Sequence, residues 1–315
     1  MKRVMILSGG TSTAWHIADV LRRYFHEHIY LIICDINPRY LVHTSLFADF
    51  YIQVPPICSP EYYRFMLQTI EERRVDILIP LIDDDIFIFH RDNNDLITRG
   101  VYSTAPCKTV TEGLSNKENL ENTLLTLGIP TPHIFKSADS IDPNGTYFVK
   151  APVGCGSRGS CLADGKIAAE VISKRKGQVV QEICHAPEIT VDVAHDGRRV
   201  YTICRERVEI KLGVSTKCRV YHDPDIQHIL ERIVAKIDLP PVFCVQFMRD
   251  VHDRWSLTDF NLRSGGGTAI SAAIGFEAVR FAAAQWLDQS ADSAWVSIPA
   301  QEHYVVRAYQ EIVTQ

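Results

Sequence analysis

Apolar runs of strand length alternate with helical patterns in the first third of the chain. Residues 3–7 and Ile29–Cys34 are continuous apolar runs, whereas residues 13–25 repeat apolar side chains every three to four positions. The first kind of run predicts a buried strand and the second an amphipathic helix. Strand, turn, helix and strand in this order predict a βαβ unit of a parallel sheet.

This outline is also that of a dinucleotide-binding unit, because residues 8–12 form a glycine turn and Asp35 ends the second strand. The GxGxxG spacing is absent, so we favour an ordinary βαβ unit. The pattern then predicts strand, helix and strand over residues 49–54, 60–73 and 76–81. The last strand runs into Asp83–Asp85, which would either cap the next helix or line a pocket at the carboxyl edge of the sheet.

Lysines and glycines stand out in the middle of the chain. A helix is predicted from Asn116-Lys117 to about Leu127, ending at Gly128. A strand over Thr146–Lys150 ends in lysine, and a segment with four small residues follows: Gly154, Gly156, Ser157 and Gly159. This is not a Walker A sequence, but backbone N–H groups of such a segment can close over phosphates.

Strand patterns dominate the C-terminal part. Strands are predicted over residues 178–183, 188–194, 200–205, 242–250 and 255–263, with helices over residues 224–237 and 268–287. Arg205 and Arg207 share one face of their strand, where they form either surface salt bridges or a binding site. His252–Arg254 is a plausible turn between the last two strands, which would place Gln246 opposite Asp259 and Asn261.

Polar side chains gather on one face of the strand over residues 255–263. Asp259, Asn261 and Arg263 alternate with apolar neighbours and therefore point the same way. Carboxylate and amide oxygens suit Mg²⁺, and the guanidinium fork suits a phosphate or a carboxylate. The alternative is a half-exposed strand with ordinary polar residues. Gln246, in an otherwise apolar strand, needs a hydrogen-bond partner or a ligand.

Composition narrows the class of protein. The chain has 315 residues, 46% hydrophobic and 23% charged, as in soluble globular proteins of about two domains. A net charge of −5 does not favour nucleic acid, and no apolar run reaches the length of a membrane span. Nine scattered cysteines argue against a disulfide framework and a zinc site, and Cys34, Cys204 and Cys244 lie in apolar runs as core thiols. We expect a cytoplasmic protein.

Taken in order, these motifs resemble the ATP-grasp superfamily of ATP-dependent ligases, in the branch of carbamoyl-phosphate-synthase-like enzymes and amino-acid ligases. Five places carry the resemblance: Lys117, Lys150 with its glycine segment, Glu182 with Glu188, Gln246, and Asp259-x-Asn261-x-Arg263. The resemblance implies an α/β fold with an α+β lid. A parallel-sheet pre-ATP-grasp domain over residues 1–110 would precede an ATP-grasp domain over residues 111–315, with the lid at about 128–182 and the catalytic subdomain at about 183–315.

The resemblance also implies roles for single residues. Lys117, Lys150 and the segment with Gly154, Gly156, Ser157 and Gly159 would bind the phosphates of ATP. Glu182 and the backbone near Cys184 would contact the adenine, and Glu188 the ribose. Gln246, Asp259 and Asn261 would bind one or two Mg²⁺ ions, for which Mn²⁺ can substitute. Arg263 would steady the γ-phosphate or an acyl phosphate.

Two positions depart from the family pattern. The last metal-binding acid is usually Glu and is Asp259 here, while the place of Gln246 is often acidic. Fewer charges would hold the metals less tightly.

The implied activity is that of a carboxylate–amine ligase, which joins a small amino-acid-like substrate to an amine through an acyl phosphate. Arg205 and Arg207 would hold the carboxylate substrate, and Asp83–Asp85 would face the amine. Alternatives are phosphorylation of bicarbonate, as in carbamoyl-phosphate synthases, and a nucleotide-binding subunit without turnover. The partners expected are small molecules, and the family favours a homodimer. The sequence names neither the acid nor the amine.

Overall fold

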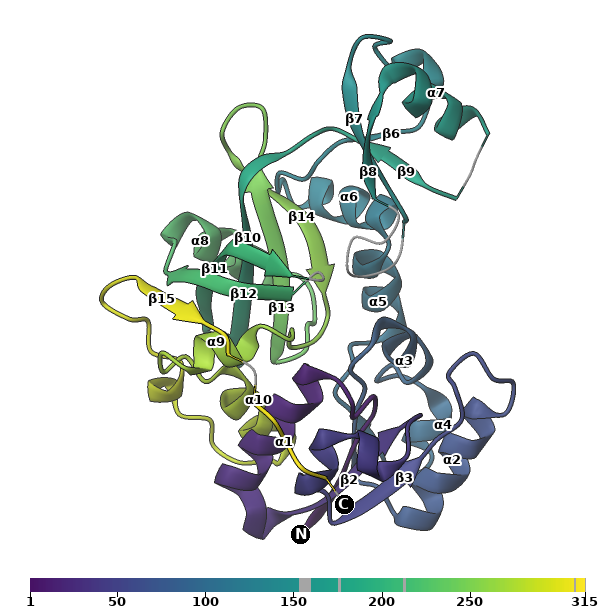
Figure 1. The fold of residues 1–315 in the computed structure, drawn as a ribbon, viewed down its shortest axis with the longest axis vertical. Helices are drawn as coiled ribbons and strands as arrows, with labels where there is room; N and C mark the ends of the chain where they lie inside the picture. Colours follow the sequence, from purple (N-terminus) through teal and green to yellow (C-terminus); the bar gives the residue numbers. More distant parts are fainter. Residues whose placement is uncertain (153–159, 175–176, 212–213, 309, 315) are drawn as a thin grey trace.

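The structure is a computed structural model, and it describes the chain except residues 153–159, 175–176, 212–213, 309 and 315. An N-terminal α/β domain lies at one end and a small lid subdomain at the other, with a larger antiparallel sheet between them (Figure 1). The α/β fold with an α+β lid that the sequence predicts is confirmed.

The N-terminal domain is built on a five-stranded parallel sheet of order β3-β2-β1-β4-β5. Its strands are β1 (Lys2–Ile6), β2 (Ile29–Asp35), β3 (Phe50–Gln53), β4 (Ile77–Ile79) and β5 (Tyr102–Ser103). Its helices are α1 (Ser12–Phe25), α2 (Tyr62–Arg73), α3 (Asp83–Ile88) and α4 (Asn94–Ile97). The predicted βαβ unit is therefore present as β1, α1 and β2.

The three acids that follow β4 occupy the first turn of α3, but they do not cap it. The N-cap position is Ile82, which makes no side-chain hydrogen bond. Asp85 is instead buried and accepts hydrogen bonds from Ser8 Oγ at 2.9 Å and Tyr62 Oη at 2.7 Å. Capping by these acids, one of the two interpretations of the sequence, is wrong. Asp85 ties α3 to the glycine turn after β1.

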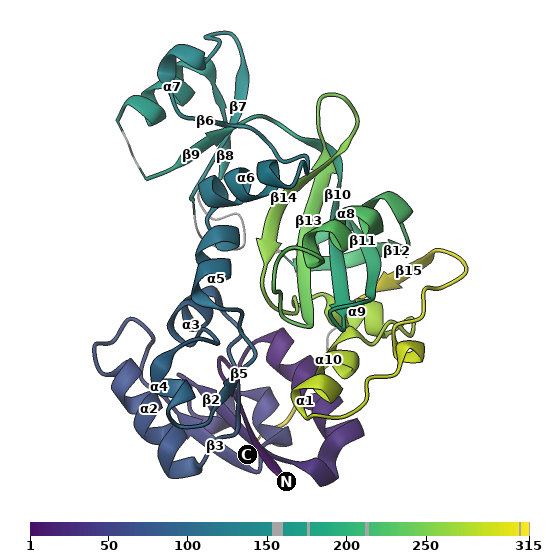
Figure 2. The same ribbon diagram turned by 180° about the vertical axis from the view of Figure 1, so that it is seen from behind.

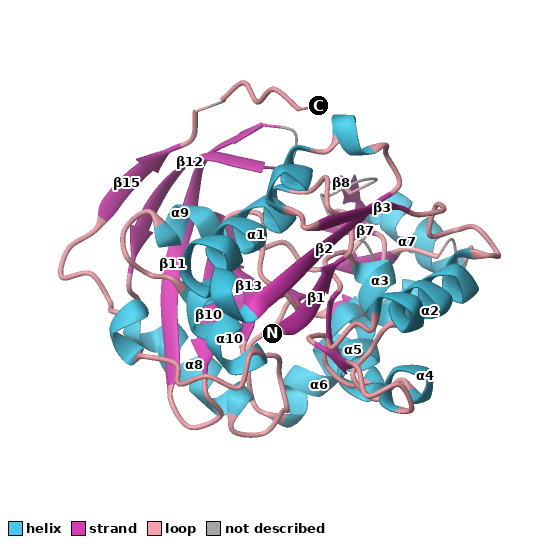
Figure 3. Cartoon of the chain, turned by 90° about the horizontal axis from the view of Figure 1, so that it is seen from below, coloured by secondary structure: helices cyan, strands magenta, loops and turns pink. Residues whose placement is uncertain are grey.

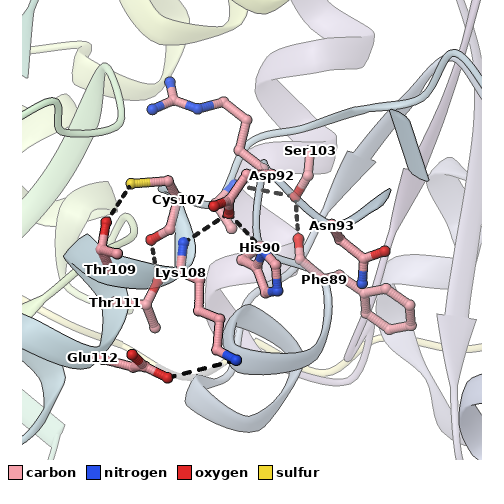
Figure 4. Close-up of polar contacts among 12 residues, drawn as sticks. Phe89, His90, Asp92, Asn93, Ser103, Cys107, Lys108, Thr109, Thr111 and Glu112 are labelled. Atoms are coloured by element: carbon pink, nitrogen blue, oxygen red, sulfur yellow. Dashed lines mark hydrogen bonds and ion pairs between the residues drawn. The ribbon is translucent and has the colours of Figure 1, made fainter. Parts of the chain in front are cut away.

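Two helices, α5 (Lys108–Ser115) and α6 (Lys117–Thr126), lead from the N-terminal domain toward the lid (Figure 2). The start of α5 is anchored by Asp92, whose Oδ1 lies 2.7 Å from the N–H of Lys108 and 2.6 Å from Nδ1 of His90 (Figure 4). Ser103 Oγ donates to the carbonyl of Phe89 beside it. The domain boundary expected at residue 110 falls inside α5.

The lid subdomain contains a four-stranded sheet of order β6-β9-β7-β8 with one helix across it. Its elements are β6 (Ile134–Phe135), β7 (Thr146–Lys150), β8 (Cys161–Asp164), α7 (Gly165–Ser173) and β9 (Val179–Gln181). It has a small core of its own, centred on Tyr147, Val149 and Ala168.

The large-sheet subdomain has six strands in the antiparallel order β14-β13-β10-β11-β12-β15. The strands are β10 (His185–His195), β11 (Val200–Lys211), β12 (Val214–Tyr221), β13 (Val242–Arg249), β14 (Trp255–Asn261) and β15 (His303–Val306). Its helices are α8 (Pro224–Val234), α9 (Thr268–Ala272) and α10 (Ala278–Trp286). The single helix predicted over residues 268–287 is wrong, because the chain turns at Gly275, whose φ of +92° favours glycine.

The two faces of the large sheet have different partners. Val191, Val193 and Phe243 pack on α8. The opposite face, with Ala194 and Ile203, shares one core with α1, α9, α10 and the N-terminal sheet (Figure 3). This second face carries the candidate site further along its strands. No helix among the described residues is long and apolar enough to span a membrane.

Candidate functional site

The strands β13 and β14 place Gln246 directly opposite Asp259, as the sequence predicts. Thr190 of β10 faces Gln246 from the other side, so these side chains form a row across the sheet. A β-bulge at Thr258 shifts the register between Asp259 and Leu257. The bulge was not predicted. Thr258 Oγ1 donates to the carbonyl of Gln246 at 3.2 Å, which closes the bulge onto the neighbouring strand.

Two lysines from different parts of the chain converge on this row. Lys117 Nζ, from the first turn of α6, lies 3.3 Å from Asp259 Oδ1. Lys150 Nζ, from the end of β7, donates to the carbonyl of Thr258 at 3.4 Å. Burial lowers the pKa of Lys150 to about 8. The negative charge of Asp259 opposes this shift, and the positive charge of Lys117 adds to it. The lid and the large sheet thus meet at a buried cluster of charge.

The predicted phosphate-binding segment begins beside this cluster. The backbone N–H of Lys117 donates to the carbonyl of Pro152 at 3.0 Å, which fixes the start of α6 against the end of β7. The four small residues predicted to bind phosphates (Gly154, Gly156, Ser157 and Gly159) lie outside the described residues.

The segment between β9 and β10 carries the residues predicted to contact adenine. Glu182 and Cys184 are half-buried, and the N–H of Glu182 donates to the carbonyl of His133 at 3.0 Å. Burial raises the pKa of the Cys184 thiol to about 11, and the charge of Glu182 raises it further. The charge of Lys150 also acts on this thiol, which places Cys184 beside the lysine cluster.

Glu188 and Arg207 form an ion pair with each other on β10 and β11. Arg207 Nε also donates to Ser215 Oγ at 3.0 Å. Glu188 is half-buried, so part of its carboxylate faces solvent. If Glu188 binds ribose, as the resemblance implies, its carboxylate would do so while paired with the Arg207 guanidinium.

Arg205 has a different environment from Arg207. It is 3% exposed, and its Nε and Nη2 each donate to the Asp192 carboxylate at 2.7 Å. Ser271 Oγ of α9 donates to Asp192 Oδ2 at 2.5 Å. The sequence left Arg205 either in a surface salt bridge or in a binding site. The structure shows a salt bridge with Asp192 that is buried rather than at the surface.

Arg263 follows β14 and turns toward the N-terminal domain. Its Nε lies 3.9 Å from Asp83 Oδ1, and its Nη1 donates to the carbonyl of Ser264 at 3.3 Å. The Nε atom is buried and has no hydrogen-bond acceptor among the described residues. Arg263 is thus the point where the large sheet approaches the acids at the start of α3.

The donor set at this end of the sheet fits a Mg²⁺ ion that is shared with phosphates. Asp259 supplies the carboxylate, and the half-buried amides of Gln246 and Asn261 have no side-chain hydrogen-bond partner within the described part of the chain. Lys117 already places a cationic group against Asp259. No group of three or more His, Cys, Asp or Glu suited to a metal occurs in the described residues. Mg²⁺ needs only one or two carboxylates when substrate phosphates supply the remaining oxygens.

Some residues near the site were not found from the sequence. Arg307, after β15, donates to the carbonyl of Gly266, and nothing in its local pattern marks it. Glu121 of α6 is 4% exposed and accepts from the N–H of Ile134 at 2.9 Å, so it fixes the first lid strand to the helix that carries Lys117. A lone acid among apolar positions of a predicted helix is the only signal that would have found it.

Two family models match this chain. Residues 4–103 match "PylC-like, N-terminal domain", and residues 174–312 match "ATP-grasp in the biosynthetic pathway with Ter operon". The comparison with curated proteins found no match.

Solved structures share the whole fold at low identity. An L-amino acid ligase from Bacillus licheniformis is 14% identical with a TM-score of 0.72, over 95% of this chain and 78% of that chain. A carboxyaminoimidazole ribonucleotide synthase from Aspergillus clavatus, complexed with ATP, is 15% identical with a TM-score of 0.74, over 97% and 81%. An N5-carboxyaminoimidazole synthetase from Staphylococcus aureus, complexed with ADP, is 13% identical with a TM-score of 0.71, over 92% and 78%.

The three-part fold, together with a lid lysine, a helix lysine and an acid-x-Asn-x-Arg strand at one junction, defines an ATP-grasp architecture. The family models agree with it, the ATP-grasp model over residues 174–312 and the PylC-like model over residues 4–103. The resemblance found in the sequence is confirmed.

Proposed function

We propose that the protein is an ATP-dependent carboxylate–amine ligase that forms an amide bond on a small amino-acid-like acid. One observation carries the proposal. Lys117, Lys150 and Asp259 come from α6, the lid and β14, yet they lie within one charged cluster. Two cations and a carboxylate at the start of a glycine-rich segment suit a nucleotide triphosphate with its metal.

In the proposed reaction, a carboxylate oxygen of the acid attacks the γ-phosphorus of ATP. The bond from that phosphorus to the β–γ bridging oxygen breaks, and ADP leaves. The amine nitrogen then attacks the acyl carbon, phosphate departs and the nitrogen loses a proton. Charge stabilisation and positioning carry most of such a phosphoryl transfer.

The residues described here would serve this chemistry in distinct ways. Lys117 and Lys150 would bind phosphate oxygens, and Arg263 would neutralise charge on the transferred group. Asp259, Asn261 and Gln246 would hold Mg²⁺, which when bound offsets the charge of the phosphates. In the same proposal, the adenosine is held by Glu182, the backbone at Cys184 and Glu188. The homodimer that the resemblance favours stays a prediction.

The test is an assay of ADP and phosphate release with Mg·ATP and a panel of amino acids, singly and in pairs, with bicarbonate included. Asp259→Asn is the main variant. The control is Asp253→Asn, an acid in the turn of the same hairpin whose side chain is 92% exposed.

Turnover that requires one acid and one amine, is lost in Asp259→Asn and is kept in Asp253→Asn is the expected result. Turnover with bicarbonate in place of the acid would move the protein to carboxyphosphate chemistry. ATP binding without turnover on any pair would contradict the ligase and leave a nucleotide-binding subunit.

A further inference from the structure

The Asp192–Arg205 pair lies beneath a glycine turn that leads from β14 to α9. A Cβ atom added to Gly267 would lie 2.0 Å from Arg205 Nη1, and one added to Gly265 would lie 2.9 Å from Cys244 Sγ. The backbone of the turn therefore rests directly on the guanidinium. Since Arg205 is 3% exposed and bound to Asp192 through two nitrogens, it supports the turn and has no face left for a substrate.

A second arginine lies close to this pair. Arg307 follows β15, and its N–H donates to the carbonyl of Thr216 at 2.8 Å, which continues the strand pairing. Its Nη2 donates to the carbonyl of Gly266. Burial and the nearby charge of Arg205 both lower the pKa of Arg307, while Asp192 opposes them.

Within the described part of the chain, no carboxylate forms an ion pair with Arg307. Asp192, the nearest source of negative charge, already binds Arg205 and Ser271. A half-buried guanidinium whose neighbours are another guanidinium and a carbonyl has spare N–H donors and an excess of positive charge.

The opposite side of the glycine turn faces the beginning of α1. A Cβ atom on Gly266 would lie 2.8 Å from Ser12 Oγ and 3.6 Å from Thr13 Oγ1. The first turn of this 14-residue helix contains no acid, and Thr11 caps only the N–H of Ala14. The N–H groups of Ser12 and Thr13 have no acceptor within the described part of the chain. The helix thus adds its positive end to the same place.

The histidine on α1 that lies nearby adds no further positive charge near pH 7. His16 lies within range of Asp192, Arg307, Asp19 and Glu277, and burial lowers its pKa, which leaves it neutral near pH 7. Its Nε2 atom is buried without a hydrogen-bond partner among the described residues.

We propose that Arg307, with the first turn of α1, binds an anionic group of the acid substrate, a carboxylate or a phosphate. This inference rests on the proposed function, which requires a site for an acid beside the nucleotide. The position fits: Arg205, Thr190, Gln246 and Asp259 pair in one row across four strands. Three strand spacings place the Arg205 end of the row about 14 Å from the Asp259 backbone. Arg307 lies near Arg205, whose charge acts on it. Arg307 is thereby a specificity-determining residue, and in this proposal it takes the role expected of Arg205 and Arg207.

The test compares Arg307→Gln and Arg307→Lys with wild type and with the control Arg219→Gln. Arg219 lies on β12 of the same sheet but pairs with Glu206 and Glu302. Binding of inorganic phosphate, acetate and succinate to the full chain with Mg·ADP present is measured by calorimetry. The three probes distinguish phosphate, monocarboxylate and dicarboxylate recognition. Retained Mg·ADP affinity shows that each variant is folded.

At least one probe is expected to bind wild type and Arg219→Gln equally, and to bind Arg307→Gln roughly 10- to 100-fold more weakly, because one charged hydrogen-bonded contact is lost. Arg307→Lys retains the charge without the fork and is expected to fall between them. For any acid that supports ADP release, KM for that acid rises by the same factor, while KM for ATP and kcat stay within about threefold of wild type.

Equal anion affinity of wild type and Arg307→Gln would overturn the inference, as would wild type that binds none of the three probes. Failure of the proposed function gives a different result, namely Arg307-dependent anion binding without ADP release on any acid.

Discussion

Lys117 Nζ lies 3.3 Å from Asp259 Oδ1, so a helix leading to the lid is joined to the last long strand of the large sheet by one ion pair. In the proposed enzyme both partners have other ligands, phosphate for the lysine and Mg²⁺ for the carboxylate. Because the two ligands arrive together as Mg·ATP, nucleotide binding exchanges this internal pair for two contacts with the substrate.

Lys117→Met is therefore expected to raise KM for ATP roughly 10- to 100-fold, since a charged contact with phosphate is lost. The measurement is the ATP dependence of ADP release, or nucleotide affinity by calorimetry. Lys174→Met is the matched control, because Lys174 lies at the end of the lid helix with 58% of its side chain exposed. Unchanged ATP affinity in Lys117→Met would remove this lysine from the site.

The buried Asp192–Arg205 pair is expected to dominate the stability of the large sheet. Asp192→Ala leaves a guanidinium buried without its partner, which costs about 3–5 kcal/mol of unfolding free energy. Glu206→Ala breaks the partly exposed pair with Arg219 and should cost less than about 1 kcal/mol. Urea unfolding of both variants measures the difference. Equal losses of unfolding free energy in the two variants would show that the buried pair stabilises the protein no more than the partly exposed one.

Gly267 is expected to tolerate no side chain. Gly267→Ala forces the new Cβ against Arg205 Nη1, so the turn or the guanidinium must move, at a cost of roughly 1–3 kcal/mol. In Gly113→Ala the new Cβ meets its nearest neighbour at 3.6 Å, inside α5, where alanine is expected to stabilise by about 0.5–1 kcal/mol. Thermal unfolding of the two variants should shift in opposite directions, and a shift in the same direction would refute the packing described here.

Asp85 is expected to make stability depend on pH. Burial raises the pKa of Asp85 to about 6, against opposing hydrogen bonds from Tyr62 and Ser8. Since the folded state holds this proton more tightly than the unfolded state, stability from this group is complete below about pH 4 and is lost as pH rises through about 6. The loss amounts to about 3 kcal/mol.

Asp85→Asn carries no titrating proton and can still accept from Tyr62. Its unfolding free energy relative to wild type is therefore expected to rise by up to about 3 kcal/mol from pH 4 to pH 7. Unfolding in urea at the two pH values measures this rise, and a difference that does not change with pH would contradict the raised pKa.

Local patterns sufficed for most of the fold and for the geometry of β13 and β14. The short connection and the alternating polarity were enough to predict the hairpin and to place Gln246 roughly opposite the Asp259–Asn261 pair. In an unbroken ladder from Arg249 and Trp255, Gln246 would pair with Thr258, so the bulge is what brings Asp259 opposite Gln246. The bulge at Thr258 was not predicted, because nothing in the alternating pattern of β14 marks it. The break between α9 and α10 was not predicted, because one glycine in an alanine-rich stretch is a weak signal of a helix end.

The partners of the arginines could not be read from the sequence. Arg205 and Asp192 are 13 residues apart and meet only because β10 and β11 form a hairpin, while Ser271 reaches them from α9. Arg307 reaches Gly266 through the pairing of β15 with β12, which no spacing rule foresees. Local patterns therefore predicted the hairpin that carries Gln246 and Asp259, whereas the tertiary structure was needed to find the surroundings of Arg205 and Arg307.

The most direct test of the ligase is the fate of a carboxylate oxygen. The acid that supports ADP release is labelled with oxygen-18 in its carboxylate, and the released phosphate is analysed by mass spectrometry. One labelled oxygen in each phosphate is predicted, because the acyl phosphate passes a carboxylate oxygen to phosphorus before the amine displaces it. Unlabelled phosphate would show that water, and not the acid, attacks ATP, and would contradict an acyl-phosphate ligase.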